Sequence, residues 1–213
     1  MNFHHAVQLF ERSELFFAHP SSWQDPYEIR LIHQENHKIY AQCWCSKGVS
    51  DAMWRIYSPN HLGIRISTST KKLRQALEKA KKHVDFDIRL GDVSYLSQFN
   101  LNKKSKVLHE ELADSFDISK AIDLLYMKRE AFDHEAEYRV VLTDHDAGPD
   151  QIAKGLRVAI NPTQLIDSIL IDPRAPDELA AALAYYFREK IGFKKKVQRS
   201  VLYKAPTPLV VEK

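Results

Sequence analysis

The sequence predicts an α+β fold in a single domain spanning 1–213, with a mixed, mainly antiparallel sheet and flanking helices. Its 213 residues, 44% hydrophobic and 28% charged, match one globular domain in length and composition. Short β-prone runs and helical patterns follow one another without strict alternation, which favours α+β over a doubly wound α/β fold. The 6 glycines form neither a P-loop nor a triple-glycine fingerprint, which excludes nucleotide binding by those motifs.

Hydrophobic periodicity places the elements of the first half of the chain. The stretch Gly-Val-Ser-Asp at 48–51 is expected to provide a turn and the N-cap of a helix that runs through Tyr57. A second helix carries Leu73 and Leu77 on its apolar face and lysines on the remaining arc; a solvated lysine face is commoner than a phosphate grip, so nucleic acid is not favoured as a partner. Helices are expected at 4–10, 51–57 and 70–83, and strands at 15–17, 39–45, 62–67 and 86–95.

The second half combines strands with two polar stretches. A helical pattern contains Ala121, Leu124, Leu125 and Lys128, and a second helix closes at Gly192. The polar stretches 100–106 and 144–154 are expected to be mobile loops. Strands are expected at 138–142, 156–160, 166–171 and 197–203, and the last helix at 176–191.

Charge and hydropathy exclude several classes of partner. Lys and Arg total 31 against 28 Asp and Glu, and this near balance does not indicate nucleic acid or an anionic membrane. No apolar run approaches the roughly 18 residues of a membrane span, and Glu11, Arg12 and Glu14 lie where a secretory signal needs its apolar core. We therefore expect a cytoplasmic protein without a membrane partner. Cys43 and Cys45 are expected to be reduced, structural thiols.

Three separated runs stand out by their aromatic and charged residues. They are FFAHPSSWQDPYE at 16–28; CWCS at 43–46 with MWRIY at 53–57 and HLG at 61–63; and Lys128 and Phe132 followed by EAEYR at 135–139. In order and spacing these runs resemble the bacterial family called domain of unknown function 2971, over about 16–171. Trp23 and Phe132 stand where that family has Phe and Trp, which keeps aromatic bulk at both positions.

The third run brings charged residues together. Glu135, Glu137 and Arg139 are spaced by two, so in an extended segment their side chains project from one face of a sheet. Two adjacent carboxylates favour retention of a proton by one of them, whereas the guanidinium favours ionisation. The spacing leaves the sign of the net shift open. It also leaves open a catalytically silent ion-pair ladder on the surface.

The same pair resembles the acidic motif of ADP-ribosyltransferase-like enzymes. This resemblance implies an NAD-consuming transferase or glycohydrolase, in the setting of a toxin or an antiphage defence effector, and an ADP-ribosyltransferase-like fold. It implies that Glu137 stabilises an oxocarbenium-like ribose and that Glu135 orients or deprotonates the acceptor. Arg139 completes the expected catalytic set. The residues expected to bind the nucleotide are Trp54, Tyr57, His61, Asp25, Glu28 and Lys128.

Two alternatives remain open. Asp25, Glu28, Glu135 and Glu137 could converge as oxygen ligands of a divalent cation, which would suit a nuclease. The protein could instead be a non-catalytic interaction module that binds a partner through its aromatic side chains. His33 and His37 have a helical spacing but no third ligand in view, so zinc is not implied. The enzymatic hypotheses require Trp54 to line one solvent-reachable hollow with Glu135 and Glu137.

Overall fold

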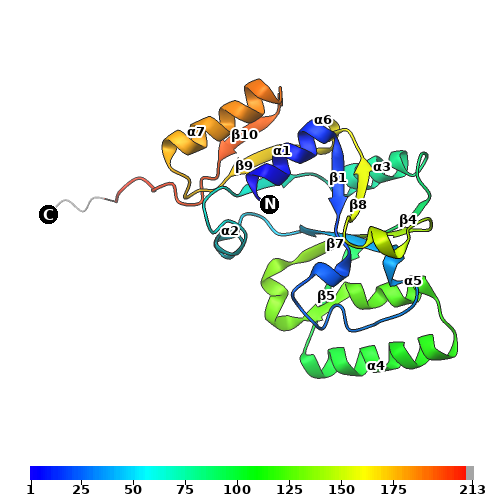
Figure 1. Ribbon diagram of the computed structural model, residues 1–213. Helices are drawn as coiled ribbons and strands as arrows, with labels where there is room; N and C mark the ends of the chain where they lie inside the picture. The colour runs from blue at the N-terminus through cyan, green and yellow to red at the C-terminus, as the bar shows by residue number, and fades with distance from the viewer. Residues whose placement is uncertain (210–213) are drawn as a thin grey trace. The chain divides into compact units, whose positions relative to one another are not determined.

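Two groups of segments, interleaved along the sequence, make up the computed structural model, which is described for residues 1–209 (Figure 1). Unit 1 combines Met1–Ser13, Val49–Ser69 and the part of the chain from Pro162 onward. Unit 2 combines Glu14–Gly48 and Thr70–Asn161. The expectation of one domain over 1–213 stays a prediction.

Unit 1 holds a three-stranded sheet in the order β10-β9-β3, where β9 pairs in parallel with β10 and antiparallel with β3. Aromatic rings pack together in this unit: the ring centroid of Phe10 lies 5.8 Å from that of Phe187 and 5.4 Å from that of Phe193. The elements are α1 (Phe3–Arg12), α2 (Asp51–Tyr57), β3 (Ile64–Ser67), α6 (Pro162–Leu165), β9 (Ser168–Ile171), α7 (Asp177–Tyr185), a π-helical turn (Tyr186–Lys190) and β10 (Lys196–Arg199).

Unit 2 is built around the antiparallel sheet β2-β7-β4. β1 and β8 form an antiparallel pair, and β5 and β6 form a parallel one. The strands are β1 (Glu14–Phe17), β2 (Ile39–Cys45), β4 (Phe86–Asp92), β5 (Ser94–Leu96), β6 (Met127–Arg129), β7 (Glu137–Asp144) and β8 (Leu156–Ala159). The helices are α3 (Thr70–Ala80), α4 (Gln98–Asp114) and α5 (Ile118–Ala121), with 3-10 helices at Pro20–Ser22, Asn36–Lys38, Ile122–Tyr126, Glu130–Glu135 and Pro149–Gln151.

β7 is the central strand of its sheet and is covered on both faces. Val140, Val141 and Leu142 are each at most 1% exposed, which explains why this run is continuously apolar rather than alternating. One face packs into a cluster formed by Ile39, Ala41, Ile122, Leu125, Tyr126 and Val141. The register of β7 with β2 and β4 sets the positions of the charged residues at its start, because Glu137 lies opposite Cys45 and Arg139 lies opposite Cys43 and Gly91.

The predicted fold class is confirmed: the structure is mixed α and β, and most strand pairs are antiparallel. Within residues 1–209 the strands divide among four small sheets rather than one. The strands outside the β2-β7-β4 sheet span only three or four residues, and each pairs with one or two other strands. None of the helices in this part of the chain is long and apolar enough to cross a membrane.

The stretch 100–106, expected to be a loop, lies instead inside α4. The side chain of Ser97 caps this helix by accepting a hydrogen bond from the Asn100 amide at 3.3 Å. Leu101, Leu108 and Leu112 are buried along one side of α4, and the polar residues between them form its solvent face. The second expected loop, 144–154, consists of turns and a 3-10 helix; its mobility stays a prediction.

Lys128 was expected on a helix with Ala121, Leu124 and Leu125, but it lies on β6. α5 is followed directly by the 3-10 helix Ile122–Tyr126, whose last residues form hydrogen bonds with other segments of unit 2. The Tyr126 hydroxyl donates to the Arg89 carbonyl at 2.8 Å, and the Leu125 carbonyl accepts from the Arg139 guanidinium. These partners end the helix before Lys128.

The anchoring of α4 can be tested by substitution. Leu101 is fully buried, so Leu101→Ala is expected to lower the free energy of unfolding by about 2–5 kcal/mol, because it removes buried methyl groups and leaves a cavity. Phe99→Ala, at a side chain 76% exposed on the same helix, is the matched control and should change stability far less. Urea unfolding measures both; equal losses would contradict the placement of α4.

Candidate functional site

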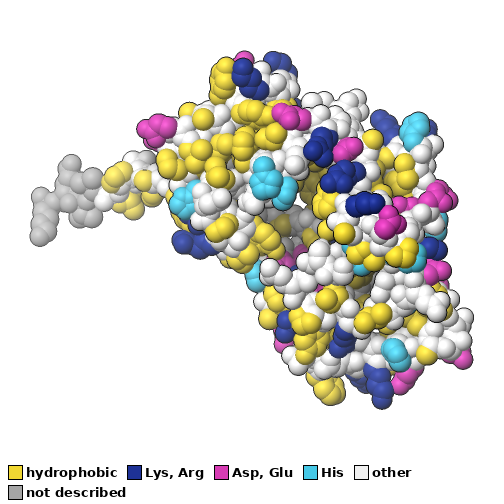
Figure 2. Space-filling model, in the orientation of Figure 1, with side chains coloured by type: hydrophobic (Ala, Val, Ile, Leu, Met, Phe, Trp, Pro, Cys, Tyr) yellow, Lys and Arg dark blue, Asp and Glu magenta, His cyan; other side chains and the backbone are white. Residues whose placement is uncertain are grey.

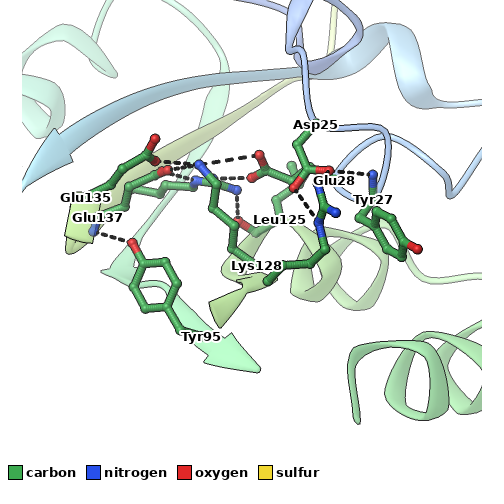
Figure 3. A network of polar contacts seen from close by, with 10 residues as sticks. Asp25, Tyr27, Glu28, Tyr95, Leu125, Lys128, Glu135 and Glu137 are labelled. Carbon is green, nitrogen blue, oxygen red and sulfur yellow. Dashed lines mark hydrogen bonds and ion pairs between the residues drawn. The ribbon is translucent and has the colours of Figure 1, made fainter. Parts of the chain in front are cut away.

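A cluster of buried charged side chains lies at the start of β7 in unit 2 (Figure 3). It consists of Glu28, Lys128, Glu135, Glu137 and Arg139, and we call it the ion cluster. Each of these residues is at most 7% exposed. A surface ion-pair ladder would be exposed to solvent, so this burial rules out the ladder that the sequence left open. A charged group is rarely taken out of water without a paired partner.

Lys128 occupies the centre of the ion cluster. Its Nζ atom donates to Glu135 Oε2 at 2.5 Å and to Glu137 Oε1 at 2.5 Å, and it lies 3.6 Å from Glu28 Oε2. Three carboxylates therefore converge on one ammonium group. The sequence left open that these carboxylates converge on a divalent cation, but in the structure the Lys128 ammonium group lies where they meet.

Arg139 is the second cation and is 1% exposed. Its Nε donates to Glu137 Oε2 at 2.7 Å, its Nη1 donates to the Leu125 carbonyl at 2.5 Å, and its Nη2 donates to Glu28. The guanidinium also lies 4.4 Å from the ring centroid of Trp23. Arg139 thus ties the loop of the first sequence run to the third run.

Glu135 and Glu137 approach each other through a turn and not through the pleat of a strand, which corrects the sequence expectation. Glu135 ends a 3-10 helix, Ala136 adopts left-handed backbone angles with φ of 43°, and β7 begins at Glu137. The Ala136 carbonyl accepts hydrogen bonds from the amide and the hydroxyl of Ser46, each at 2.9 Å. The Ala136 amide donates a hydrogen bond to the backbone carbonyl of Asp133 at 3.1 Å.

Tyr95 completes the clamp on this turn. Its hydroxyl oxygen accepts a hydrogen bond from the Glu137 amide at 2.8 Å, and the Glu137 carbonyl accepts from the Val93 amide at 3.0 Å (Figure 3). Tyr95 and Ser46 were not among the predicted site residues. No sequence signal identifies them, because their roles arise from contacts with residues more than 40 positions away.

The charges of the ion cluster do not balance when all its members are ionised, because three carboxylates face two cations. Burial raises the pKa of Glu135, and its hydrogen bond to Glu137 favours retention of the proton. Burial alone would raise the pKa of Glu137 too, but hydrogen bonds from Glu135 and Arg139, with the positive charges of Arg139 and Lys128, hold it below its usual value. Burial also raises the pKa of Glu28. The raised pKa of Glu135 and the lowered pKa of Glu137 mean that, within this pair, Glu135 is protonated more readily than Glu137.

Opposed pKa shifts of two adjacent carboxyl groups are what acid–base chemistry requires. Glu137 stays ionised at neutral pH, while Glu135 holds its proton to a higher pH than a free glutamate. Such a pair can present a fixed negative charge and a transferable proton at the same point. Lys128 holds both carboxylates in place.

Asp25 lies beside the ion cluster but pairs with a different cation. Its carboxylate accepts from Arg129 Nη2 at 3.0 Å and from the Tyr27 amide at 3.1 Å. The Arg129 guanidinium lies 4.5 Å from the Tyr27 ring centroid, and Lys128 Nζ lies 4.8 Å from that of Phe132. The aromatic residues of the first and third runs therefore shield the cations of the site.

The three aromatic residues expected to hold nicotinamide belong to unit 1. Trp54 is 6% exposed, its carbonyl accepts a hydrogen bond from Arg174 at 2.8 Å, and its indole lies against Gly63. Tyr57 is 48% exposed at the end of α2, and His61 follows with φ of 62°. That Trp54, Tyr57 and His61 share a hollow with Glu135 and Glu137 stays a prediction.

Cys43 and Cys45 are free thiols. Cys43 is paired with Arg139 in the β2–β7 register and reaches solvent. The protein packed around it raises the pKa of Cys43 to about 12, and although Arg139 opposes this shift, the Glu137 carboxylate adds to it. The thiol is therefore protonated at neutral pH and is a poor nucleophile.

The carboxylates that could have held a metal ion do not form a metal site in the described part of the chain. In residues 1–209, no group of three or more His, Cys, Asp and Glu side chains is arranged to hold a metal ion. Of the four proposed carboxylates, Asp25 pairs with Arg129 and the other three pair with Lys128. His33 and His37 are not one helical turn apart, because only 36–38 is helical there.

A family model described as protein of unknown function (DUF2971) matches residues 53–140. The predicted resemblance to this family is confirmed. The DUF2971 match includes Trp54, Lys128 and both glutamates of the Glu-x-Glu pair, but it begins after Asp25 and Glu28. No curated protein and no solved structure matches the chain, so the ADP-ribosyltransferase-like fold stays a prediction.

The raised pKa of Glu135 predicts a pH dependence of stability. Because folding raises the pKa of Glu135, the stability that this group contributes is present at low pH and is lost as pH rises through the folded-state pKa. Glu135→Gln cannot ionise, so its free energy of unfolding should fall less steeply than that of the wild type as pH rises above the ordinary pKa of a glutamate. Glu130→Gln, at an exposed glutamate of the same 3-10 helix, is the control. Parallel curves for the wild type and Glu135→Gln would contradict the assignment.

The turn at Ala136 predicts a stabilising substitution. A left-handed non-glycine residue costs about 1–2 kcal/mol, and glycine adds about 0.4–1 kcal/mol of unfolded-state entropy. Ala136→Gly should therefore raise the free energy of unfolding by up to ~1 kcal/mol. Ala113→Gly, on the exposed side of α4, should lower it by a similar amount. A destabilised Ala136→Gly protein would show that the Ala136 methyl group is needed.

Proposed function

We propose that the ion cluster is the active site of an enzyme that cleaves the nicotinamide–ribose bond of NAD and transfers the ADP-ribosyl group to an acceptor or to water. The observation that carries this proposal is the Glu135–Glu137 pair, whose pKa values are shifted in opposite directions and whose geometry is fixed by the turn at Ala136. The resemblance of the Glu-x-Glu pattern to ADP-ribosyltransferase-like enzymes supports the same reaction class.

The two glutamates have separate roles in this reaction. The bond between the ribose carbon and the nicotinamide nitrogen breaks with its electron pair, and neutral nicotinamide leaves. The ionised Glu137 carboxylate stabilises the positive charge that develops on the ribose. The acceptor oxygen forms the new bond to the ribose carbon and gives its proton to the ionised form of Glu135. Activity should therefore rise with pH through the pKa of Glu135.

The cations hold this arrangement. Lys128 donates to both carboxylates, and Arg139 donates to Glu137 and Glu28, so no solvent reorganisation is needed to orient the acids. A preorganised charge in a buried setting acts more strongly than the same charge in water. Lys128 and Arg139 are thus positioning residues. An NAD-consuming activity of this kind would suit a toxin or an antiphage defence effector.

A metal-dependent nuclease has less support. The ammonium group of Lys128 already lies where Glu28, Glu135 and Glu137 converge, which is the place that a divalent cation would need. Figure 2 shows Lys and Arg side chains interleaved with Asp and Glu on the face in view, rather than gathered into a basic track. Nucleic acid binding usually relies on such a track.

The proposal is tested by incubating the purified protein with NAD and measuring released nicotinamide by chromatography, with and without candidate protein and DNA acceptors. Glu137→Gln keeps the side-chain volume and should lower the rate at least a hundredfold, whereas Glu130→Gln should leave it unchanged. Circular dichroism and thermal unfolding establish that both variants are folded. An undiminished rate in folded Glu137→Gln protein, or no nicotinamide release by the wild type, would refute the proposal.

A further inference from the structure

A groove of about 650 Å³ in unit 2 lies along α4. The helix lines it with Asn100, Lys103, Lys104, Val107, Leu108 and Glu111. These positions recur every three or four residues, with Lys103/Lys104 and Val107/Leu108 as adjacent pairs, so they form one stripe along the helix. At 1.5 Å per residue the stripe is about 16 Å long, which corresponds to about three turns of a helix laid beside it.

The floor of the groove is apolar. Leu108 is 6% exposed and belongs to the apolar cluster beneath α4, and Leu96 and Met127 are partly buried against that cluster. Val107, which lines the groove, is 46% exposed. A solvent-exposed apolar side chain beside an apolar floor is typical of surfaces that bind a partner.

The rim of the groove carries an excess of positive charge. Glu111 is neutralised by Lys120 at 2.7 Å, and Asp123 by Arg89 at 2.6 Å. Lys103 and Lys104 form no ion pair with an acidic side chain in the part of the chain that the structure describes. The groove therefore offers two uncompensated ammonium groups next to its apolar floor.

We propose that this groove is a docking site for an acidic amphipathic helix of a partner protein. Apolar side chains one helical turn apart on the partner would contact Leu96, Leu108 and Met127. Glutamate or aspartate side chains flanking them would pair with Lys103 and Lys104. This is the helix-in-groove mode of recognition, in which apolar contacts supply affinity and charge complementarity sets orientation and partner choice.

The test uses a fluorescein-labelled 14-residue peptide of Leu, Glu and Ala, with Leu at helical spacing, and measures its binding by fluorescence anisotropy. The double variant Lys103→Glu/Lys104→Glu should weaken binding at least tenfold, and Val107→Asp should weaken it as well. Lys106→Glu is the control: it reverses one charge on the same helix, where the double variant reverses two, at a side chain that is 80% exposed and does not line the groove. It should change affinity less than threefold.

Several outcomes would overturn the proposal. One is the absence of binding by the Leu/Glu/Ala peptide at millimolar concentration. Another is equal binding of a peptide with Lys in place of Glu, or of polyglutamate without Leu, because either result removes the need for both chemistries. Equal loss in Lys106→Glu would indicate non-specific charge attraction. Stronger binding to anionic phospholipid vesicles than to the peptide, or self-association of the protein that Lys103→Glu/Lys104→Glu abolishes, would assign the groove to a different occupant.

Discussion

The convergence of three carboxylates on Lys128 is the interaction on which the described site depends. An ammonium group is stable in a buried position only when acidic partners and hydrogen-bond acceptors surround it, and Glu135, Glu137 and Glu28 supply them. With Arg139 included, the ion cluster holds three acids and two bases. In this buried setting the pKa of Glu135 is raised and that of Glu137 is lowered, so the groups that bury a lysine also form a pair of carboxyl groups with opposed pKa shifts.

This arrangement joins segments that are distant in the sequence. Glu28 comes from the loop after β1, and Lys128 comes from β6. Glu137 and Arg139 are the first and third residues of β7. The turn at Ala136 directs both glutamates toward Lys128. Hydrogen bonds with Ser46 and Tyr95 hold the strained backbone of this turn. A left-handed alanine persists only where its surroundings fix it, and strain of this kind is often found at functional sites.

The proposed reaction and the proposed docking groove use separate parts of unit 2. The charged groups of the ion cluster are buried and pair with one another, whereas beside α4 the described residues give Lys103 and Lys104 no acidic partner. These two designs suit different tasks. A preorganised buried pair favours a reaction at one bond, while an open groove with apolar and cationic walls favours a partner with complementary side chains.

The sequence by itself determined most elements and the resemblance to DUF2971, because apolar periodicity and cap residues act over a few positions. It predicted α2 with a cap in the stretch 48–51 and the apolar run of β7, and it selected Glu28, Lys128 and the Glu-x-Glu pair as site residues. It misread 100–106 as a loop because Leu101 is the only one of the three leucines that bury α4 to lie inside this polar stretch. Only the tertiary structure decided that Lys128 occupies the point where the carboxylates meet, that the pKa of Glu135 is raised while that of Glu137 is lowered, and that Tyr95 and Ser46 hold the turn, because these follow from contacts between residues that no local pattern connects.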